Sequence, residues 1–159
     1  MSVRSVTKDP EALTLTLIGD FAAPPARVWR VWSEPRLLEK WWGPPTYPAT
    51  FATYEFEPGG SAAYYMTGPE GDRHHGGWDF TAIEAPRSLS FDDFFADETG
   101  TPNRNLPGTT AVVTLEASSD GTVMTITSHF GSLEQLEQLA AMGMIEGLTA
   151  AVSQIDALL

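Results

Sequence analysis

The chain has 159 residues and a net charge of −12, with nine Lys and Arg against 21 Asp and Glu. Phosphate groups repel such a chain, so we expect no nucleic-acid partner and no attraction to anionic membranes. The sequence has no cysteine, which excludes a disulfide framework, a thiolate nucleophile and cysteine-ligated zinc or iron–sulfur sites. No apolar run approaches the ~20 residues of a membrane helix, so we expect no membrane insertion and a cytoplasmic protein.

The N-terminal part predicts one strand and two short helices. Leu13, Leu15 and Leu17 alternate with threonines, and this period of two is typical of a β-strand, here ending near Phe21. Apolar residues at helical spacing then predict a short helix that stops before Pro35, because the residue before proline disfavours the helical region. These residues are Val28, Trp29, Val31 and Trp32. A second short helix is predicted over residues 35–41.

Six further strand-like runs follow, separated by clusters of Gly, Pro and Asp that favour turns. They cover residues 49–56, 61–67, 74–85, 88–95, 109–117 and 122–130. The short connections between most of them are typical of an antiparallel meander. The connection over residues 96–108 is long, and both a plain flexible loop and a lid over a pocket remain open for it.

The end of the chain predicts one long helix over residues 132–157. Ser132 is the expected N-cap, and Gln135 three residues later completes a capping box. Small residues dominate the middle of this helix, including Gly143 and Gly147, which cost roughly 1 kcal/mol each relative to alanine. Close packing of the helix on the sheet is one explanation for them, and room for a ligand is the other.

The order of these elements predicts an α+β fold with helices on one face of an antiparallel sheet. We expect a single domain over residues 1–159, with its core in residues 12–158.

An ordered set of motifs carries a family resemblance. It begins with Phe21-Ala22-Ala23-Pro24, Val28-Trp29, Trp32, Pro35, Leu38 and Lys40-Trp41-Trp42-Gly43-Pro44, and continues with Gly59-Gly60, Gly68-Pro69-Glu70-Gly71, Pro86, Leu89 and Gly143-Met144-Ile145-Glu146-Gly147. In these motifs the chain resembles the activator of heat-shock protein 90 ATPase homologue family, of the START-like (SRPBCC, Bet v 1-like) superfamily. It departs from the family pattern at Glu34 and over residues 74–78.

The resemblance implies a helix-grip fold, in which about six or seven curved strands surround a long C-terminal helix and enclose a cavity. It implies less about function, because one fold hosts many activities. The eukaryotic activator joins such a domain to a separate N-terminal domain that these residues do not include. A chaperone partner is therefore expected by analogy only, and the protein could be a monomer or a homodimer.

The sequence predicts no metal site, no cofactor and no catalytic constellation. His74 and His75 are neighbours on a strand and point to opposite faces, while His129 lies on another strand, and no spacing of the H-E-x-x-H type occurs. Asp92 and Asp93 are expected at an exposed strand end; the alternative is that one faces inward as a general base. Glu146 is expected to face solvent, with a hydrogen bond inside the cavity as the alternative.

Aromatic and methionine side chains, with a few polar groups, favour a small-molecule pocket between the sheet and the C-terminal helix. The expected contacts are Trp41, Trp42, Tyr64, Met66, Trp78, Phe80, Phe91, Thr127, His129, Met144 and Leu148. Binding of a small hydrophobic molecule is thus the leading hypothesis. A cyclase- or hydrolase-like enzyme using His129, Asp93 or Glu146, and a regulator of a chaperone ATPase, are the alternatives.

Overall fold

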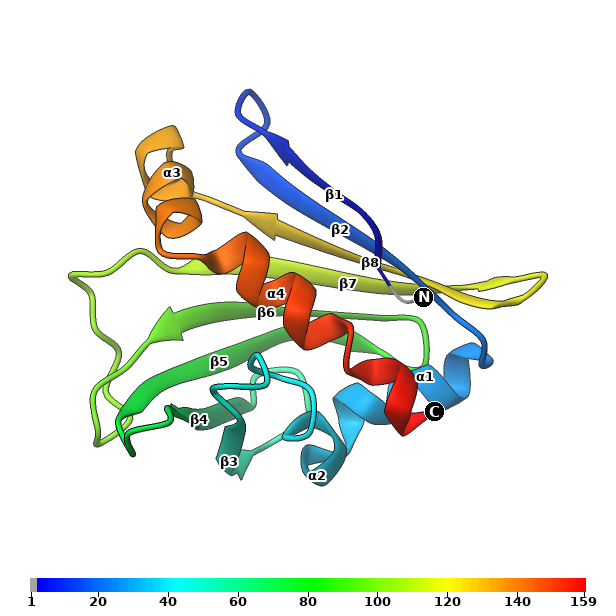
Figure 1. Cartoon of the computed structure of the whole chain (residues 1–159), viewed down its shortest axis with the longest axis horizontal. Coiled ribbons are helices and arrows are strands. Elements are labelled where there is room, and N and C mark those ends of the chain that lie inside the picture. The colour runs from blue at the N-terminus through cyan, green and yellow to red at the C-terminus, as the bar shows by residue number, and fades with distance from the viewer. Residues whose placement is uncertain (1–2) are drawn as a thin grey trace.

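One curved antiparallel sheet of eight strands forms the body of the fold, with helices packed against its concave face (Figure 1). The computed structural model describes residues 3–159. The strands are β1 (Val3–Asp9), β2 (Thr14–Phe21), β3 (Ala49–Tyr54), β4 (Ser61–Thr67), β5 (Arg73–Glu84), β6 (Ser88–Phe95), β7 (Thr109–Ser118) and β8 (Gly121–His129). The helices are α1 (Pro25–Ser33), α2 (Pro35–Leu38), α3 (Leu133–Ala141), α4 (Met144–Val152) and the terminal 3-10 helix η1 (Ile155–Leu158).

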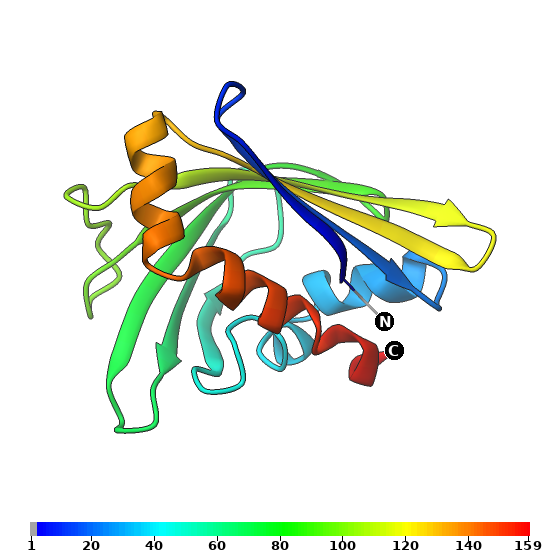
Figure 2. The same cartoon turned by 45° about the horizontal axis from the view of Figure 1, so that its top comes forward.

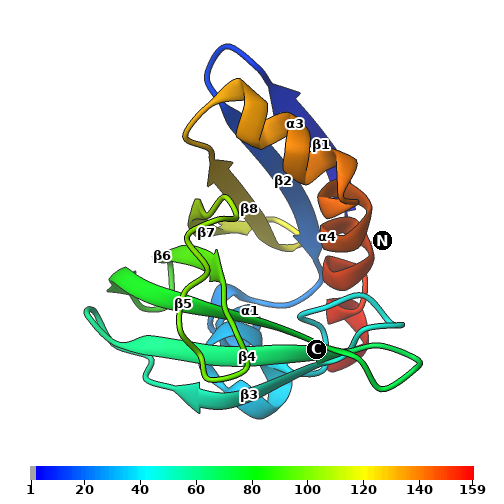
Figure 3. The same ribbon diagram turned by 90° about the vertical axis from the view of Figure 1, so that its left-hand side faces the viewer.

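The strands lie in the order β1-β2-β8-β7-β6-β5-β4-β3, so the sheet has β1 and β3 at its edges. Figure 3 shows how strongly it bends: β3, β4 and β5 form one wing, β1, β2 and β8 the other, and α3 and α4 cross the open side between them. This confirms the α+β class, and the arrangement is consistent with the helix-grip expectation. The expected count of six or seven strands is wrong, because β1 adds an eighth.

Strand β1 lies in a stretch that the sequence analysis left without an element. Its register against β2 shifts between Val3 and Ser5, so the strand contains an irregularity of the β-bulge kind. Val3 and Val6 therefore both pack against the core although they are three residues apart. This spacing hides the period of two on which strand prediction depends. Charged side chains on the same edge strand weaken the signal further.

The C-terminal helix is not continuous, so the prediction of one helix over residues 132–157 is wrong. Ser132 does cap α3, accepting a hydrogen bond from the Gln135 backbone N–H at 3.1 Å. The other half of the predicted capping box does not form, because the Gln135 side chain accepts from the Gly131 N–H at 3.1 Å instead of the Ser132 N–H. The helix then ends at Ala141, and Gly143 has a left-handed backbone with φ of 90°. Helix α4 starts from there in a different direction, as Figure 2 shows.

Helix α2 is also shorter than the expected residues 35–41 and ends at Leu38. The backbone N–H groups of Trp41 and Trp42 still donate to the Leu38 carbonyl, at 3.2 and 2.9 Å. The chain therefore continues as a hydrogen-bonded turn, which brings the two tryptophans against the sheet.

The long connection between β6 and β7 is held by its own hydrogen bonds. The Asp97 carboxylate accepts from the Thr99 and Thr101 backbone N–H groups at 2.8 and 3.1 Å, and the Asn103 N–H donates to the Phe95 carbonyl at 2.7 Å. Such an Asx-type turn gives the loop a defined shape.

Two glycines of the C-terminal segment provide a test of the broken helix. Gly143→Ala is expected to destabilise the protein by about 1 kcal/mol, because its φ is unfavourable for any residue with a Cβ. Gly147→Ala is the matched control, since a Cβ at this position meets no atom within 4 Å and alanine favours helix by about 1 kcal/mol. Urea unfolding measures both changes. A continuous helix would be stabilised by both substitutions, so stabilisation by Gly143→Ala would contradict the break.

Candidate functional site

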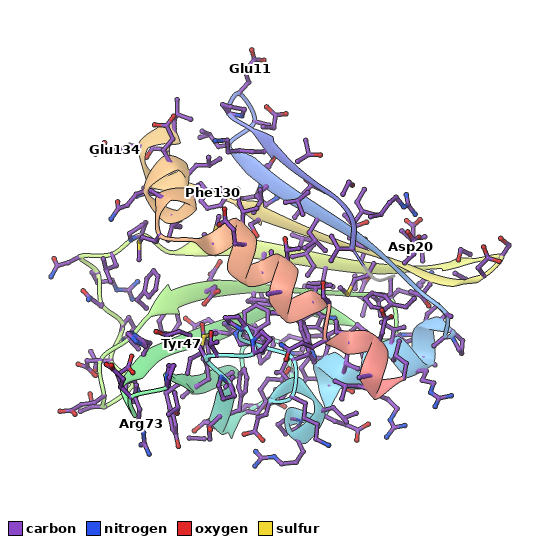
Figure 4. All side chains as sticks on the ribbon, in the orientation of Figure 1. Glu11, Asp20, Tyr47, Arg73, Phe130 and Glu134 are labelled. Carbon is purple, nitrogen blue, oxygen red and sulfur yellow. The ribbon has the colours of Figure 1, made fainter. Side chains whose placement is uncertain are left out.

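A cavity of about 520 Å³ lies between the concave face of the sheet and helices α3 and α4, and it opens to solvent. Aromatic and aliphatic side chains form most of its wall. The sheet side and its adjoining loop contribute Trp42, Tyr64, Met66, Phe91, Ala111 and Ile126, and the helix side contributes Leu139, Met144, Leu148 and Ala151. Two separate buried clusters supply these residues, one around the tryptophans and one beneath α3 that includes Phe130 (Figure 4).

The turn after α2 fixes Trp42 in the cavity wall. Gly43 has φ of 97°, and a Cβ there would lie 2.4 Å from the Tyr47 carbonyl oxygen, so only glycine fits. The Gln154 side-chain amide donates to the Gly43 and Trp41 carbonyls at 2.8 and 3.3 Å. The C-terminal segment therefore clamps this turn, which joins two distant parts of the chain at the same side of the cavity.

Behind the wall, Trp78 is the centre of an aromatic cluster. Its ring stacks on Phe91 with centroids 4.1 Å apart and meets Trp42 edge-on at 4.8 Å. It also contacts Phe51 and Tyr64, with centroids 5.4 and 6.0 Å away. Trp78 is fully buried. Trp42, Tyr64 and Phe91 border the cavity and pack against Trp78, which does not border it.

A glycine gives Tyr64 its position. Tyr64 on β4 and Gly76 on β5 are directly opposite each other in the sheet. A Cβ at Gly76 would lie 2.6 Å from the Tyr64 ring and hydroxyl, so the tyrosine ring occupies the space that a side chain would take. The phenol therefore lies flat over β5 and directs its hydroxyl toward β6.

Asp93 on β6 accepts a hydrogen bond from the Tyr64 hydroxyl, which lies 3.2 Å from its Oδ1. Protein atoms surround both groups, yet each keeps some accessible surface because each borders the cavity. Burial raises the pKa of Asp93 to about 7, against the lowering effect of three nearby donors, the Tyr64 hydroxyl, the Trp78 indole N–H and the Phe94 backbone N–H. Burial, together with the Asp93 charge, raises the pKa of Tyr64 well above its ordinary value. The carboxyl can therefore change its protonation state near neutral pH.

Two further donors point into this region. The indole N–H groups of Trp42 and Trp78 are buried, and neither forms a hydrogen bond with any group of residues 3–159. Both are nevertheless close enough to the Tyr64 hydroxyl to favour its ionised form, and Trp78 has the same effect on Asp93. A carboxyl and three donors are thus concentrated in one region of a mostly apolar wall, where Asp93, Tyr64 and Trp42 border the cavity and Trp78 lies behind them.

The structure brings six of the predicted contact residues together around the cavity. They are Trp42, Tyr64, Met66, Phe91, Met144 and Leu148. Three others, Trp41, Trp78 and Phe80, are buried in the aromatic core behind the wall. Trp41 donates from its indole N–H to the Val31 carbonyl at 2.8 Å, which fixes it away from the cavity.

Thr127 and His129 do not border the cavity, which corrects the expected register of β8. The buried face of this strand carries Met124, Ile126 and Ser128, and Ser128 is the one that lines the cavity. Thr127 and His129 alternate with these residues and lie on the convex face. A displacement by one residue moves a whole set of side chains to the other face, so both assignments fail together.

Asp93 borders the cavity, which agrees with the alternative that one of the two neighbouring aspartates faces inward and not with the favoured exposed position. The expectation of an exposed strand end is correct for Asp92 and wrong for Asp93. A signal was present: Leu89 and Phe91 are buried and define the inward phase of β6, which Asp93 shares. His74 also lies at the cavity rim, where its Nε2 is 2.7 Å from Asp72 Oδ2 and its ring packs against Tyr47. Figure 4 marks the position of Tyr47.

Of the three acid–base candidates, only Asp93 borders the cavity; His129 and Glu146 are exposed elsewhere.

Within residues 3–159, no cluster of three or more His, Asp or Glu has the geometry of a metal site. In the same part of the chain, no helix is long and apolar enough to cross a bilayer.

Comparison with known proteins supports the fold and the family resemblance. The family model described as "Activator of Hsp90 ATPase homolog 1-like protein" matches residues 22–159. A crystal structure of a Mycobacterium smegmatis protein is 46% identical, with 99% of this chain and 96% of that chain covered and a TM-score of 0.92. A solution structure of an Arthrobacter aurescens protein is 56% identical, covers 96% and 89% of the two chains, and has a TM-score of 0.92.

The AHSA1 protein from Silicibacter pomeroyi is 20% identical, covers 91% of this chain and 95% of that chain, and has a TM-score of 0.72. This likeness shows the fold alone. A search of curated proteins finds no match.

The buried carboxyl predicts a pH-dependent stability. In the unfolded chain Asp93 loses its proton near 3.8, while the folded protein holds it until about 7, so the free energy of unfolding falls as the pH rises between these values. We expect the stability of wild type relative to Asp93→Asn to fall by about 1–2 kcal/mol from about pH 5 to about pH 7.5, allowing for the surface that faces cavity water. Urea unfolding at both pH values measures it.

Asp92→Asn is the matched control, since it removes the same charge from the neighbouring position on the convex face. An equal pH effect for the two substitutions would contradict the assignment of a buried, titrating carboxyl to Asp93.

Proposed function

The chain belongs to the family of activator of Hsp90 ATPase homolog 1-like proteins, and we propose that it binds a small hydrophobic molecule in the cavity between the sheet and helices α3 and α4. The observation that carries this proposal is the cavity itself: about 520 Å³, mostly apolar, with one concentrated polar region. Sites for small molecules have volumes of about 300–1,000 Å³ and this kind of lining.

Packing energetics support an occupant. Because the cavity opens to solvent, its apolar wall is in contact with water, and an apolar ligand that replaces the water gains about 25 cal/mol per Å² of buried surface together with dispersion contacts. Here the helix break at Gly143 and the absent side chain of Gly147 leave the space unfilled on the helix side. An apolar ligand would regain those contacts.

The two alternative functions have less support. A cyclase- or hydrolase-like mechanism using His129, Asp93 or Glu146 would gain support from two of these residues facing the cavity, and only Asp93 borders it. Regulation of a chaperone ATPase is supported by the family description alone. Addition of the protein to a bacterial Hsp90-type chaperone tests it, and unchanged ATPase turnover counts against it.

A cavity-filling substitution tests the proposed function. We expect wild type to bind N-phenyl-1-naphthylamine, an uncharged fluorescent probe, with enhanced probe emission and a raised melting temperature. Gly147→Leu should weaken binding about tenfold or more, because its side chain extends into space that is open beyond the Cβ position. Gly147→Ala is the control that supplies the same gain in helix propensity without filling the cavity.

Two outcomes would count against binding in this cavity. One is equal affinity of the leucine and alanine variants for the probe. The other is a wild-type protein that is stabilised by no member of a panel of lipids, aromatic compounds and polyketide-like compounds, since a ligand at a hundred times its Kd stabilises by about 2.7 kcal/mol.

A further inference from the structure

We propose that the ligand of this cavity is a lipophilic amine, whose protonated nitrogen pairs with the Asp93 carboxylate while its apolar body fills the space beneath α3 and α4. The inference rests on the proposed function and names the chemical class that the cavity selects. It draws on the charge of the wall, on the aromatic rings beside Asp93 and on the direction of the surrounding donors.

The first argument is charge. Asp93 borders the cavity, and within residues 3–159 the lining includes no Lys and no Arg. The three ion pairs that involve arginine lie elsewhere: Arg4 with Asp20, Arg30 with Glu34, and Arg36 with Glu39. The contact between His74 and Asp72 lies at the rim and does not involve Asp93. A carboxylate in a low-dielectric wall without a counter-charge is unfavourable, and a ligand cation supplies that charge. An anionic ligand would meet repulsion from Asp93 and from a chain with net charge −12.

The second argument is the aromatic lining next to the carboxyl. Trp42, Tyr64 and Phe91 all border the cavity, and Tyr64 is hydrogen-bonded to Asp93. The negative faces of such rings attract ammonium groups, and tryptophan does so most strongly. Aromatic rings grouped around one carboxylate thus favour a cation over a neutral polar group.

The third argument is the direction of the donors. The Tyr64 hydroxyl, the Trp78 indole N–H and the Phe94 backbone N–H all favour the ionised form of Asp93. Of these groups, the Tyr64 hydroxyl donates to Asp93 Oδ1 at 3.2 Å from the neighbouring part of the sheet, and Asp93 itself borders the cavity, where a ligand can approach it. A ketone has no proton to donate to the carboxylate, and an alcohol donates one uncharged hydrogen bond where an ammonium donates charge-assisted ones.

The groups that face Asp93 bear on how binding depends on pH. Tyr64 on β4 contacts it, and His74 on β5 and Tyr47 lie at the rim, where Asp72 offsets any charge on His74. β7 and β8 contribute Thr109, Ala111, Ile126 and Ser128, none of which is charged. The charged residues of α3 and α4 are Glu134, Glu137 and Glu146, all exposed; Figure 4 shows Glu134 pointing away from the sheet. A second groove that Asp93 also borders contains Asp79, Asp92, Arg104 and His129. The substitution Asp93→Asn therefore separates the contribution of Asp93 to the pH dependence from that of the other groups.

The test compares three probes with one ring system: 2-naphthylmethylamine, 2-naphthylmethanol and 2-naphthoate. Calorimetric titration of the whole chain at about pH 7.5 should give the amine an affinity at least about tenfold higher than that of the alcohol, with the carboxylate weakest. Amine affinity should also rise about tenfold from about pH 6 to about pH 8, because Asp93 ionises over this interval and the amine stays protonated.

Asp93→Asn should abolish the amine preference and the pH dependence while binding of the alcohol persists. Asp92→Asn, which removes an equal charge from the convex face, should change neither, and this excludes non-specific attraction to an acidic surface. Two outcomes overturn the inference and leave the proposed function standing. One is an amine affinity no higher than that of the alcohol, and the other is an equal loss of amine affinity in Asp93→Asn and Asp92→Asn. If folded wild-type protein binds none of the three probes, the proposed function fails as well.

Discussion

The packing of aromatic rings around Trp78 is the constraint on which the site depends. Trp78 contacts Trp32 of α1, Trp42 of the following turn, Phe51 of β3 and Phe91 of β6. It thereby ties the N-terminal helical segment to one wing of the curved sheet. The outermost rings of the cluster form part of the cavity wall. Trp78 supports this wall from behind, since it is fully buried and does not border the cavity.

This arrangement has an energetic cost that is concentrated at the site. A buried N–H without a partner costs about 1–3 kcal/mol, and the structure has two of them in the indoles of Trp42 and Trp78. The buried carboxyl of Asp93 adds a further unfavourable contribution when it ionises. Polar groups that oppose stability in this way are expected at functional sites, where local rules are broken and the rest of the fold compensates.

Sequence patterns predicted most of the fold because most strands have a regular period of two and clear turns between them. β1 was missed because its irregular register brings Val3 and Val6 to the same side. The sequence does not predict the helix break, because a glycine inside a helical pattern looks the same whether its backbone is helical or left-handed. The left-handed backbone of Gly143 is seen only in the structure.

The site was predictable in part. The phases of Leu89 and Phe91 and of Met124 and Ile126 would have placed Asp93 inside and His129 outside. No pattern distinguishes Trp41 from Trp42, since both are large, aromatic and adjacent. Which of them fills the core and which lines the cavity depends on the turn at Gly43 and its clamp by Gln154, more than a hundred residues away. Such choices are made by tertiary contacts.

The sheet and the helices contribute different properties to the cavity. Its concentrated polar region comes from β4, β5, β6 and the turn after α2, where backbone pairing and aromatic packing fix each side chain. The inner faces of α3 and α4 contribute apolar and small residues, and their shape depends on one glycine-centred break. Substitutions on the helices therefore change the volume available to a ligand, whereas substitutions at Asp93 or Tyr64 change its charge. Shape and charge selectivity are physically separable in this fold, because different elements supply them.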